Sequence, residues 1–311
     1  MKLPFDFANK LLLRLVLPGA LLAATFWPVL IAVTEQLQIE VDDKVLAPIA
    51  IIAFGWLMLF LDMPLYMLAE GRRFWPEKLK AWCIARQAKR LRALQDMRRT
   101  LSGQAQIEID LQIRTFPIDK SGNSTALYPT RLGNLIHAQE SYPDRKYGID
   151  GVFAWYRLWV SVDKDLRAEL DDQQAIVDSA LYASFVAGLA AVACGAYALI
   201  RTTTGDRVLG SLPSGCVLLA LAVVCIVVGW LLYNACVMAQ AQYGEIFCAL
   251  FDQNVEKLKF ELVLAELARA FSDPALASAP ARLRAQSAIR FLKYHKYRPI
   301  GQSVNLDIRE W

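Results

Sequence analysis

The segment LPSGCVLLALAVVCIVVGWLLYNACVM, residues 212–238, decides the fold because it holds no Asp, Glu, Lys or Arg. A helix needs roughly 20 mostly apolar residues to cross about 30 Å of hydrocarbon, and this segment exceeds that length. Residues 11–33, 45–68 and 181–200 are also mostly apolar over a sufficient length. The sequence therefore predicts an all-α membrane protein with four transmembrane helices, and the lipid bilayer is its first expected partner.

The composition argues against a wholly soluble chain, because hydrophobic residues make up 56% of the 311 residues. Lys2 and Lys10 precede the first apolar segment, as they would in a secretory signal, but the segment is too long and no small-residue cleavage site follows cleanly. We interpret it as a retained anchor. Cys194, Cys225 and Cys236 lie inside expected spans and Cys216 lies near an outer helix end, so a disulfide framework is not expected.

Lysine and arginine in the short flanks predict the orientation, because basic flanks are retained on the cytoplasmic side. The hairpin at 34–45 carries four acidic residues and one lysine, and we expect it outside. Residues 71–100 carry ten basic and two acidic residues and are expected inside. The loop at 201–211, with two arginines and one aspartate, disagrees mildly. Both termini are therefore predicted to be cytoplasmic, in a bacterial inner (plasma) membrane.

The spans divide the chain into four parts. From residue 163 we expect one long helix into the third span, and the periodicity through 243–267 predicts that the fourth span continues as a helix into the cytoplasm. The expected parts are a transmembrane hairpin at 1–70, a cytoplasmic helical module at 71–178, a second transmembrane hairpin at 179–238, and cytoplasmic C-terminal helices with a tail at 239–311.

A small two-stranded ribbon is also expected. Apolar and polar residues alternate at 107–114 and again at 303–309, which is the period of a half-buried strand. A lone strand is not stable, and a two-stranded ribbon is marginal in water without further packing. We therefore expect the two segments to pair, within one subunit or between subunits, and to rest on cytoplasmic helices.

A basic amphipathic helix is expected at residues 76–101, soon after the second span. Each cation near anionic head groups contributes about 1 kcal/mol of binding. Two interpretations stay open: contact with anionic lipids or a cytoplasmic protein partner, and a topology determinant with a solvated face. No recognised nucleic-acid motif accompanies the charge, so no nucleic-acid partner is expected. The candidate contact residues are Arg72, Arg73, Lys78, Lys80, Arg86, Lys89 and Arg90.

The most distinctive motifs lie in and after residues 129–159. The segment PTRLGN (129–134), the run KYGID (146–150) with a later aromatic-Arg-Leu run, YGE (243–245) and Phe251-Asp252 resemble an uncharacterised group of bacterial multi-pass, four-span membrane proteins. The resemblance implies the same membrane architecture and no activity. The candidate residues of the cytoplasmic module are Arg131, Asn134, His137, Tyr147, Asp150, Arg157, Tyr243 and Glu245.

The sequence lacks the motifs of common enzymes. It has two histidines, His137 and His295, and no C-x-x-C, H-E-x-x-H, G-x-S-x-G, Walker A or dinucleotide-binding glycine pattern. We therefore expect no catalytic residue, no metal site and no cofactor. An interfacial enzyme acting on lipids would have only Asp62, His137 and Glu245 as candidate groups.

Asp62 is the ion or proton candidate. It lies deep in the second span beside Pro64, where a carboxylate and freed backbone carbonyls could coordinate a cation or relay protons. The alternative is structural: Asp62 sits at the inner interface and pairs with Arg72, Arg73 or Arg14. Arg14 itself lies near the cytoplasmic end of the first span and is expected to snorkel to the interface.

Two functional hypotheses follow. Small residues at four-residue intervals in the third span, Ala183, Ala187, Ala191 and Gly195, indicate close helix packing within the subunit or in a homo-oligomer. The leading hypothesis is a non-enzymatic oligomeric membrane scaffold or signalling component with a cytoplasmic docking module. The alternative is a small ion channel or pore-forming membrane effector gated by that module, although the spans offer few polar residues to line a conduit.

Overall fold

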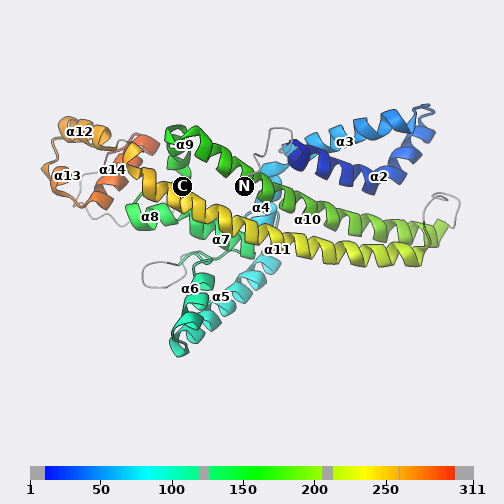
Figure 1. Ribbon diagram of the computed structural model, residues 1–311, viewed down its shortest axis with the longest axis horizontal. Helices are drawn as coiled ribbons and strands as arrows, with labels where there is room; N and C mark the ends of the chain where they lie inside the picture. Colours follow the sequence, from blue (N-terminus) through cyan, green and yellow to red (C-terminus); the bar gives the residue numbers. More distant parts are fainter. Residues whose placement is uncertain (1–10, 119–125, 205–212, 259, 298–311) are drawn as a thin grey trace. The chain divides into compact units, whose positions relative to one another are not determined.

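The computed structural model describes residues 11–118, 126–204, 213–258 and 260–297, and they are predominantly helical (Figure 1). None of these residues lies in a β-strand. Four helices are long and apolar enough to cross a membrane, namely Leu12–Gln36, Asp43–Phe60, Lys164–Thr203 and Gly215–Leu258. The prediction of an all-α chain with four such helices is therefore confirmed over the described residues.

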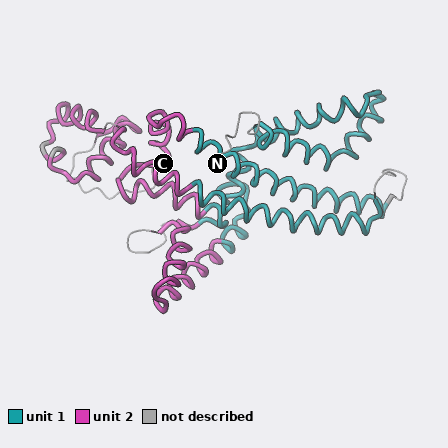
Figure 2. The backbone as a smooth tube through the Cα atoms, viewed as in Figure 1, with its two compact units in different colours: residues 1–83, 128–133, 168–243 teal, residues 84–127, 134–167, 244–311 magenta. Residues whose placement is uncertain are grey.

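The chain forms two compact units, drawn in teal and magenta in Figure 2. Unit 1 comprises residues 1–83, 128–133 and 168–243, and unit 2 comprises residues 84–127, 134–167 and 244–311. Four helices contribute residues to both units: α5 (Glu77–Thr100), α7 (Arg131–Glu140), α10 (Lys164–Thr204) and α11 (Gly215–Asn254).

The remaining elements of unit 1 form its N-terminal helical hairpin. They are the π-helix η1 (Leu12–Val16), α2 (Leu17–Gln36), α3 (Asp43–Phe60) and α4 (Asp62–Glu70). Glycine allows the two arms to cross closely, because a Cβ added at Gly19 or Gly55 would overlap the backbone of the facing arm. Such close approach gains dispersion contacts where lipid supplies no hydrophobic drive for helix association.

The second apolar segment is broken rather than continuous. The sequence predicts one span over 45–68, whereas α3 ends at Phe60 and α4 begins at Asp62. Pro64 accounts for the break, because proline lacks an N–H and its ring would clash with the Phe60 carbonyl in a continuous helix. The break places Asp62 in the first turn of α4.

Helix α10 packs against the hairpin within unit 1. Leu22, Met58, Tyr182 and Val186 form a buried cluster that joins α2, α3 and α10. Further along α10, the Tyr197 hydroxyl donates a hydrogen bond to the backbone oxygen of Thr25 (3.1 Å). Three segments that are distant in the sequence therefore share one core.

The strand predicted at 107–114 is wrong, because these residues belong to α6 (Gln104–Ile113) and the turn after it. The alternating apolar residues also satisfy a helical period: Ile109 and Ile113, four apart, pack against Leu91 and Leu94 of α5. Gly103, with a φ of +65°, makes the turn between α5 and α6. The proposed partner strand at 303–309 lies outside the described residues.

The rest of unit 2 consists of short helices. They are α8 (Tyr142–Tyr147), α9 (Gly151–Ser161), η3 (Val255–Leu258), α12 (Phe260–Phe271), α13 (Pro274–Ser278) and α14 (Ala281–Tyr294). Leu264, Leu267, Leu276 and Ala288 form the core of the last three helices. The Trp155 ring of α9 lies 4.8 Å from the Phe247 ring of α11, centroid to centroid.

Candidate functional site

Unit 1 contains a polar cluster among its apolar helices. We call it the Asp178 cluster, and it comprises Arg14, Asp62, Tyr66, Asp171, Gln174, Asp178 and Tyr182. These side chains come from η1, α4 and α10. Ionisable groups inside transmembrane helices are costly, so such a cluster is the first place to look for a function.

An ion pair forms the centre of the Asp178 cluster. Arg14 Nε lies 2.8 Å from Asp178 Oδ2, and Arg14 Nη1 lies 3.4 Å from Asp171 Oδ1. The Asp178 side chain is only 9% exposed, whereas the Asp171 side chain is 42% exposed. The pair with Asp178 is therefore the stronger one, because water screens it less.

Two neutral donors complete the coordination of Asp178. The Tyr66 hydroxyl donates to Asp178 Oδ1 (2.6 Å), and Gln174 Nε2 donates to the same oxygen (2.8 Å). Gln174 Nε2 also lies 2.9 Å from the Tyr66 hydroxyl oxygen. Satisfying a buried carboxylate in this way offsets the cost of removing it from water.

Asp62 has a different partner from any predicted for it. The Tyr182 hydroxyl donates to Asp62 Oδ1 at 2.6 Å. Arg14 pairs with the two aspartates of α10, and Arg72 pairs with Glu70, so the predicted ion pair to Asp62 is not formed by the described residues. Asp62 is instead a carboxylate with a neutral donor, one helical turn before Tyr66.

The charged residues of the Asp178 cluster determine which roles it can have. It holds one arginine and three aspartates. The ion pair and the hydrogen bonds tie η1, α4 and α10 together, and the carboxylates outnumber the arginine.

A second polar cluster lies in unit 2, around Asp252 of α11. The Tyr142 and Tyr147 hydroxyls donate to its carboxylate at 2.9 and 2.6 Å, and Lys146 Nζ lies 3.0 Å away. Partial burial, together with the Asp252 carboxylate, raises the pKa of both tyrosines, so their hydroxyls remain donors at neutral pH. The cluster joins α8 to α11 within unit 2.

Asp150 joins two further elements of unit 2. Its carboxylate accepts from the Phe153 backbone N–H (3.0 Å), which caps α9, and from Lys293 Nζ of α14 (2.7 Å). Partial burial opposes the charged carboxylate, but these two hydrogen bonds outweigh it and lower the pKa of Asp150.

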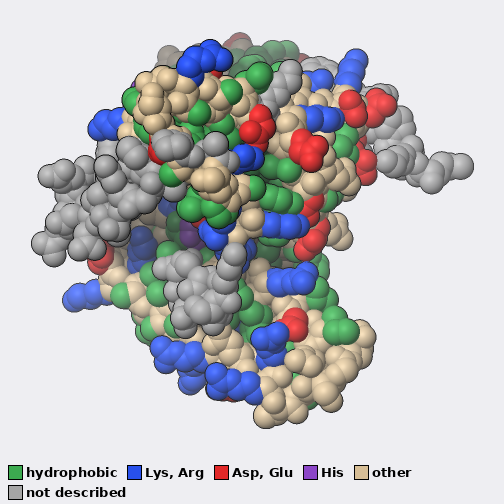
Figure 3. Space-filling view, turned by 90° about the vertical axis from the view of Figure 1, so that its left-hand side faces the viewer, with side chains coloured by type: hydrophobic (Ala, Val, Ile, Leu, Met, Phe, Trp, Pro, Cys, Tyr) green, Lys and Arg blue, Asp and Glu red, His purple; other side chains and the backbone are tan. Residues whose placement is uncertain are grey.

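The basic residues predicted to contact lipid or a partner lie on and before α5. Lysine and arginine side chains (blue) gather along the lower edge of the face in Figure 3. Arg73, Lys78, Arg86 and Lys89 are exposed. Lys80 and Arg90 are half-buried, and so is Arg72, which pairs with Glu70 and lies 5.4 Å from the centre of the Tyr128 ring.

The candidates from the distinctive motifs do not converge on one site. In unit 1, Arg131 Nη1 donates to Asn234 Oδ1 (2.9 Å), and Tyr243 is half-buried. In unit 2, Asn134 is buried, His137 Nδ1 lies 4.0 Å from Glu140, Arg157 lies over the Phe153 ring, and Glu245 is exposed. Tyr147 and Asp150 belong to the two separate interactions described above.

Sequence reasoning missed most of the Asp178 cluster. The signal is a helical spacing of polar residues: Asp171, Gln174, Asp178 and Tyr182 lie three or four residues apart and share one face of α10. Asp62 and Tyr66 have the same spacing on α4. The pattern indicates a row of polar residues that continues along α10 into the apolar part of the third span.

The comparisons identify no relatives: the chain matches no protein-family model, no curated protein and no solved structure. The resemblance carried by PTRLGN therefore stays a prediction. Among the residues that the structure describes, no group of three or more His, Cys, Asp or Glu side chains could hold a metal ion.

Proposed function

We propose that the protein is a non-enzymatic, self-associating membrane scaffold of the bacterial inner membrane, anchored by four spans and carrying its docking surfaces on the cytoplasmic side. The observation that carries this proposal is an apolar stripe on α9 that no described residue covers. Val152, Tyr156 and Val160 are 62%, 76% and 67% exposed, while Ala154 and Leu158 on the opposite face are fully buried.

The α9 stripe is suited to a second copy of the same chain. The two valines stand four residues before and four residues after Tyr156, so the stripe is symmetric about the tyrosine. A two-fold axis through Tyr156 would set Val152 of one copy on Val160 of the other, with the two tyrosine rings in contact. Two-fold contacts of this kind, with the same patch on both partners, are the commonest in homo-oligomers.

Membrane anchoring compensates for the small area of the stripe. Stable interfaces usually bury about 1,200–2,000 Å² in total, which three side chains on each copy do not supply. Confinement to the bilayer raises the effective concentration of the two stripes. The lipid-facing surfaces of the spans offer further contact area, with exposed Trp56, Phe60 and Trp230.

The charge pattern supports the cytoplasmic assignment of the docking surface. Basic residues on α5 follow the second span, and basic flanks are retained in the cytoplasm. The same helix would then face anionic head groups, which is one of the two interpretations that the sequence leaves open.

Mass photometry in nanodiscs tests the scaffold proposal. We expect the wild type to form dimers or larger assemblies and Val160→Glu to shift it towards monomer. Leu262→Glu is the matched control, because Leu262 is 66% exposed on α12 of the same unit and lies outside the stripe. A wild type that is strictly monomeric, or a Val160→Glu variant that assembles like Leu262→Glu, would contradict the proposal.

A second candidate function is a proton or cation pathway through the Asp178 cluster, and the excess of carboxylates over arginine favours it. Asp62 is the group to test because the group that donates to its carboxylate, the Tyr182 hydroxyl, is neutral. The pathway predicts ion or proton flux in reconstituted vesicles that Asp62→Asn reduces at least about tenfold. Identical flux in the two proteins would remove this function.

A further inference from the structure

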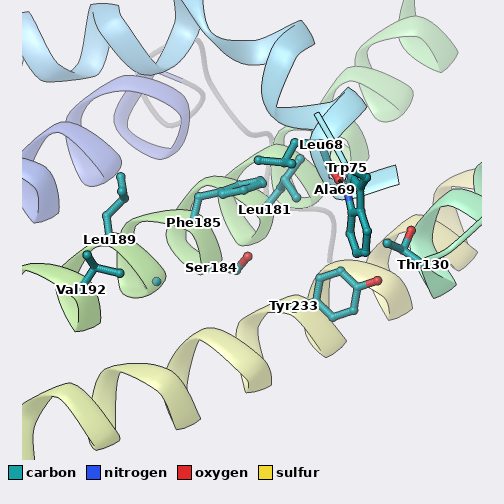
Figure 4. Close-up of a pocket in the computed structure, with 11 residues that line it drawn as sticks. Leu68, Ala69, Trp75, Thr130, Leu181, Ser184, Phe185, Leu189, Val192 and Tyr233 are labelled. Carbon is teal, nitrogen blue, oxygen red and sulfur yellow. Dashed lines mark hydrogen bonds between the residues drawn. The ribbon is translucent and has the colours of Figure 1, made fainter. Parts of the chain in front are cut away.

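An open apolar groove runs along one side of unit 1, with a volume of about 480 Å³ (Figure 4). Helix α10 provides most of its length, from Leu181 to Val192, and α4 provides Leu68. Trp75 and Tyr233 stand together at one end in Figure 4, and Val192 stands at the other. The Trp75 indole N–H donates to the Leu68 backbone oxygen (2.8 Å), which fixes the ring in the wall.

The groove matches the depth of one leaflet of a bilayer. Leu181 and Val192 are eleven residues apart, which is about 16 Å along a helix. The hydrocarbon core of a bilayer is about 30 Å thick, so the groove spans roughly half of it. Val192, at the deep end, lies within Lys164–Thr203, the third helix that is long enough to cross a membrane. Trp75 lies after the second such helix, Asp43–Phe60.

None of the described residues of unit 1 fills the middle of the groove. Gly188 lines it, and a Cβ added at Gly188 would meet no atom within 4 Å. Gly188 also lines a second, smaller groove of about 350 Å³, together with Cys225 and Gly229 of α11. The space between α10 and α11 therefore continues past Gly188.

Two cations lie close in the sequence to residues that line the Trp75 end of the groove. Arg131 follows Thr130, which lines the groove, and its guanidinium donates to Asn234, the neighbour of Tyr233 in the chain. Asn234 is neutral, so this contact leaves the charge of Arg131 uncompensated. Arg73, which is exposed, adds a second cation two residues before Trp75.

The hydrogen-bond donors at this end favour binding of an anion by a guanidinium group over binding by backbone N–H groups. The N–H groups of Leu132 and Gly133, in the first turn of α7, already donate to the Tyr233 hydroxyl (3.3 Å) and to Thr130 Oγ1 (2.9 Å). An anion reaching this end would therefore bind Arg131, whose planar fork matches the oxygens of a phosphate.

We propose that the groove is a binding site for an anionic phospholipid, with one acyl chain lying along α10 between Leu68 and Val192 and the phosphate at Arg131. The apolar walls match an acyl chain, and the depth of about one leaflet matches its length. The cation at the interfacial end matches the phosphate. This inference does not depend on the scaffold proposal, because every residue it uses lies in unit 1 and none belongs to the α9 stripe.

Native mass spectrometry of the detergent-solubilised chain, titrated with phosphatidylglycerol or phosphatidylcholine, tests the site. We expect phosphatidylglycerol to bind at least about fivefold more tightly. Arg131→Gln should abolish that preference, whereas Arg269→Gln, which removes an exposed cation of α12 in unit 2, should keep it. Gly188→Leu should fill the groove and weaken binding of phosphatidylglycerol at least about tenfold.

Gly195→Leu is the matched control for the groove, because a Cβ at Gly195 also meets no atom within 4 Å and the residue lies outside both grooves. Thermal melting verifies that both leucine variants fold. A phosphatidylglycerol carrying brominated acyl chains should quench wild-type fluorescence more than that of Trp75→Phe.

Three results would overturn the proposal. The first is equal binding of phosphatidylglycerol by Gly188→Leu and Gly195→Leu, and the second is a preference for phosphatidylglycerol that survives Arg131→Gln. The third is a change of oligomeric mass in Gly188→Leu with unchanged lipid binding, which would assign the groove to a helix of a second copy.

Discussion

Arg14 Nε lies 2.8 Å from Asp178 Oδ2, so a side chain at the start of the first apolar helix neutralises a carboxylate 164 positions later in the chain. The Asp178 side chain is 9% exposed and also accepts from Tyr66 and Gln174. This one ion pair joins η1 to α10, and it is the natural place to test what holds unit 1 together.

Arg14→Gln should destabilise the protein by on the order of 3 kcal/mol, because it leaves the Asp178 carboxylate buried without its cation. Unfolding by SDS in mixed micelles, followed by far-UV circular dichroism, measures the change. Arg14→Gln/Asp178→Asn should recover most of the loss, since no unpaired charge then remains. Equal stability of Arg14→Gln and the exposed control Arg73→Gln would show that the ion pair contributes nothing.

The number of helices that are long and apolar enough to cross a membrane could be predicted from the sequence, but the partners of the polar residues inside them could not. Four apolar windows suffice to predict four spans, because the length needed to cross a bilayer is fixed. The partners of Arg14 and Asp62 depend on which helices are neighbours, and nothing local in the chain specifies that. The spacing of Asp171, Gln174 and Asp178 indicates a polar face of α10, yet not what faces it.

The wrong prediction of a strand shows a second limit of the sequence, because one pattern of apolar residues can fit both the period of a strand and the period of a helix. Residues 107, 109, 111 and 113 alternate as in a strand, but the same set contains two pairs spaced four apart as in a helix. Packing against α5 decides between them, since it buries Ile113 to 7% exposure and leaves Ile107 at 53%. Tertiary contact therefore overrides the local alternation.

Alanine substitutions on α6 test this helical register. Ile113→Ala should cost about 2–4 kcal/mol because it opens a cavity among Leu91, Leu94 and Phe116. Ile107→Ala should change stability by less than about 0.5 kcal/mol, since the side chain is mostly exposed. Thermal melting in nanodiscs measures both. In a strand the two residues would share one face, and similar losses from the two variants would favour that arrangement.

Labelling of the native cysteines tests the proposed orientation. Cys216 is exposed at the start of α11, whereas Cys83 and Cys248 are half-buried and lie on the proposed cytoplasmic side. A membrane-impermeant maleimide should label wild type in intact spheroplasts and should not label Cys216→Ser. Breaking the spheroplasts open should expose Cys83 to the reagent. Labelling of Cys216→Ser before lysis at the level of wild type would reverse the orientation.

We expect the stability of unit 2 to fall at acid pH, because Asp150 loses its charge there. Its folded-state pKa is lowered below the ordinary value near 4, so its contribution is complete above that value and is lost as the pH falls through the folded pKa. Asp150→Asn keeps a capping oxygen for Phe153 but removes the ion pair with Lys293. The variant should therefore melt at a lower temperature than wild type at pH 7, and the difference should shrink as the pH approaches 2. A difference that stays constant between pH 7 and pH 2 would assign the loss to packing or capping instead.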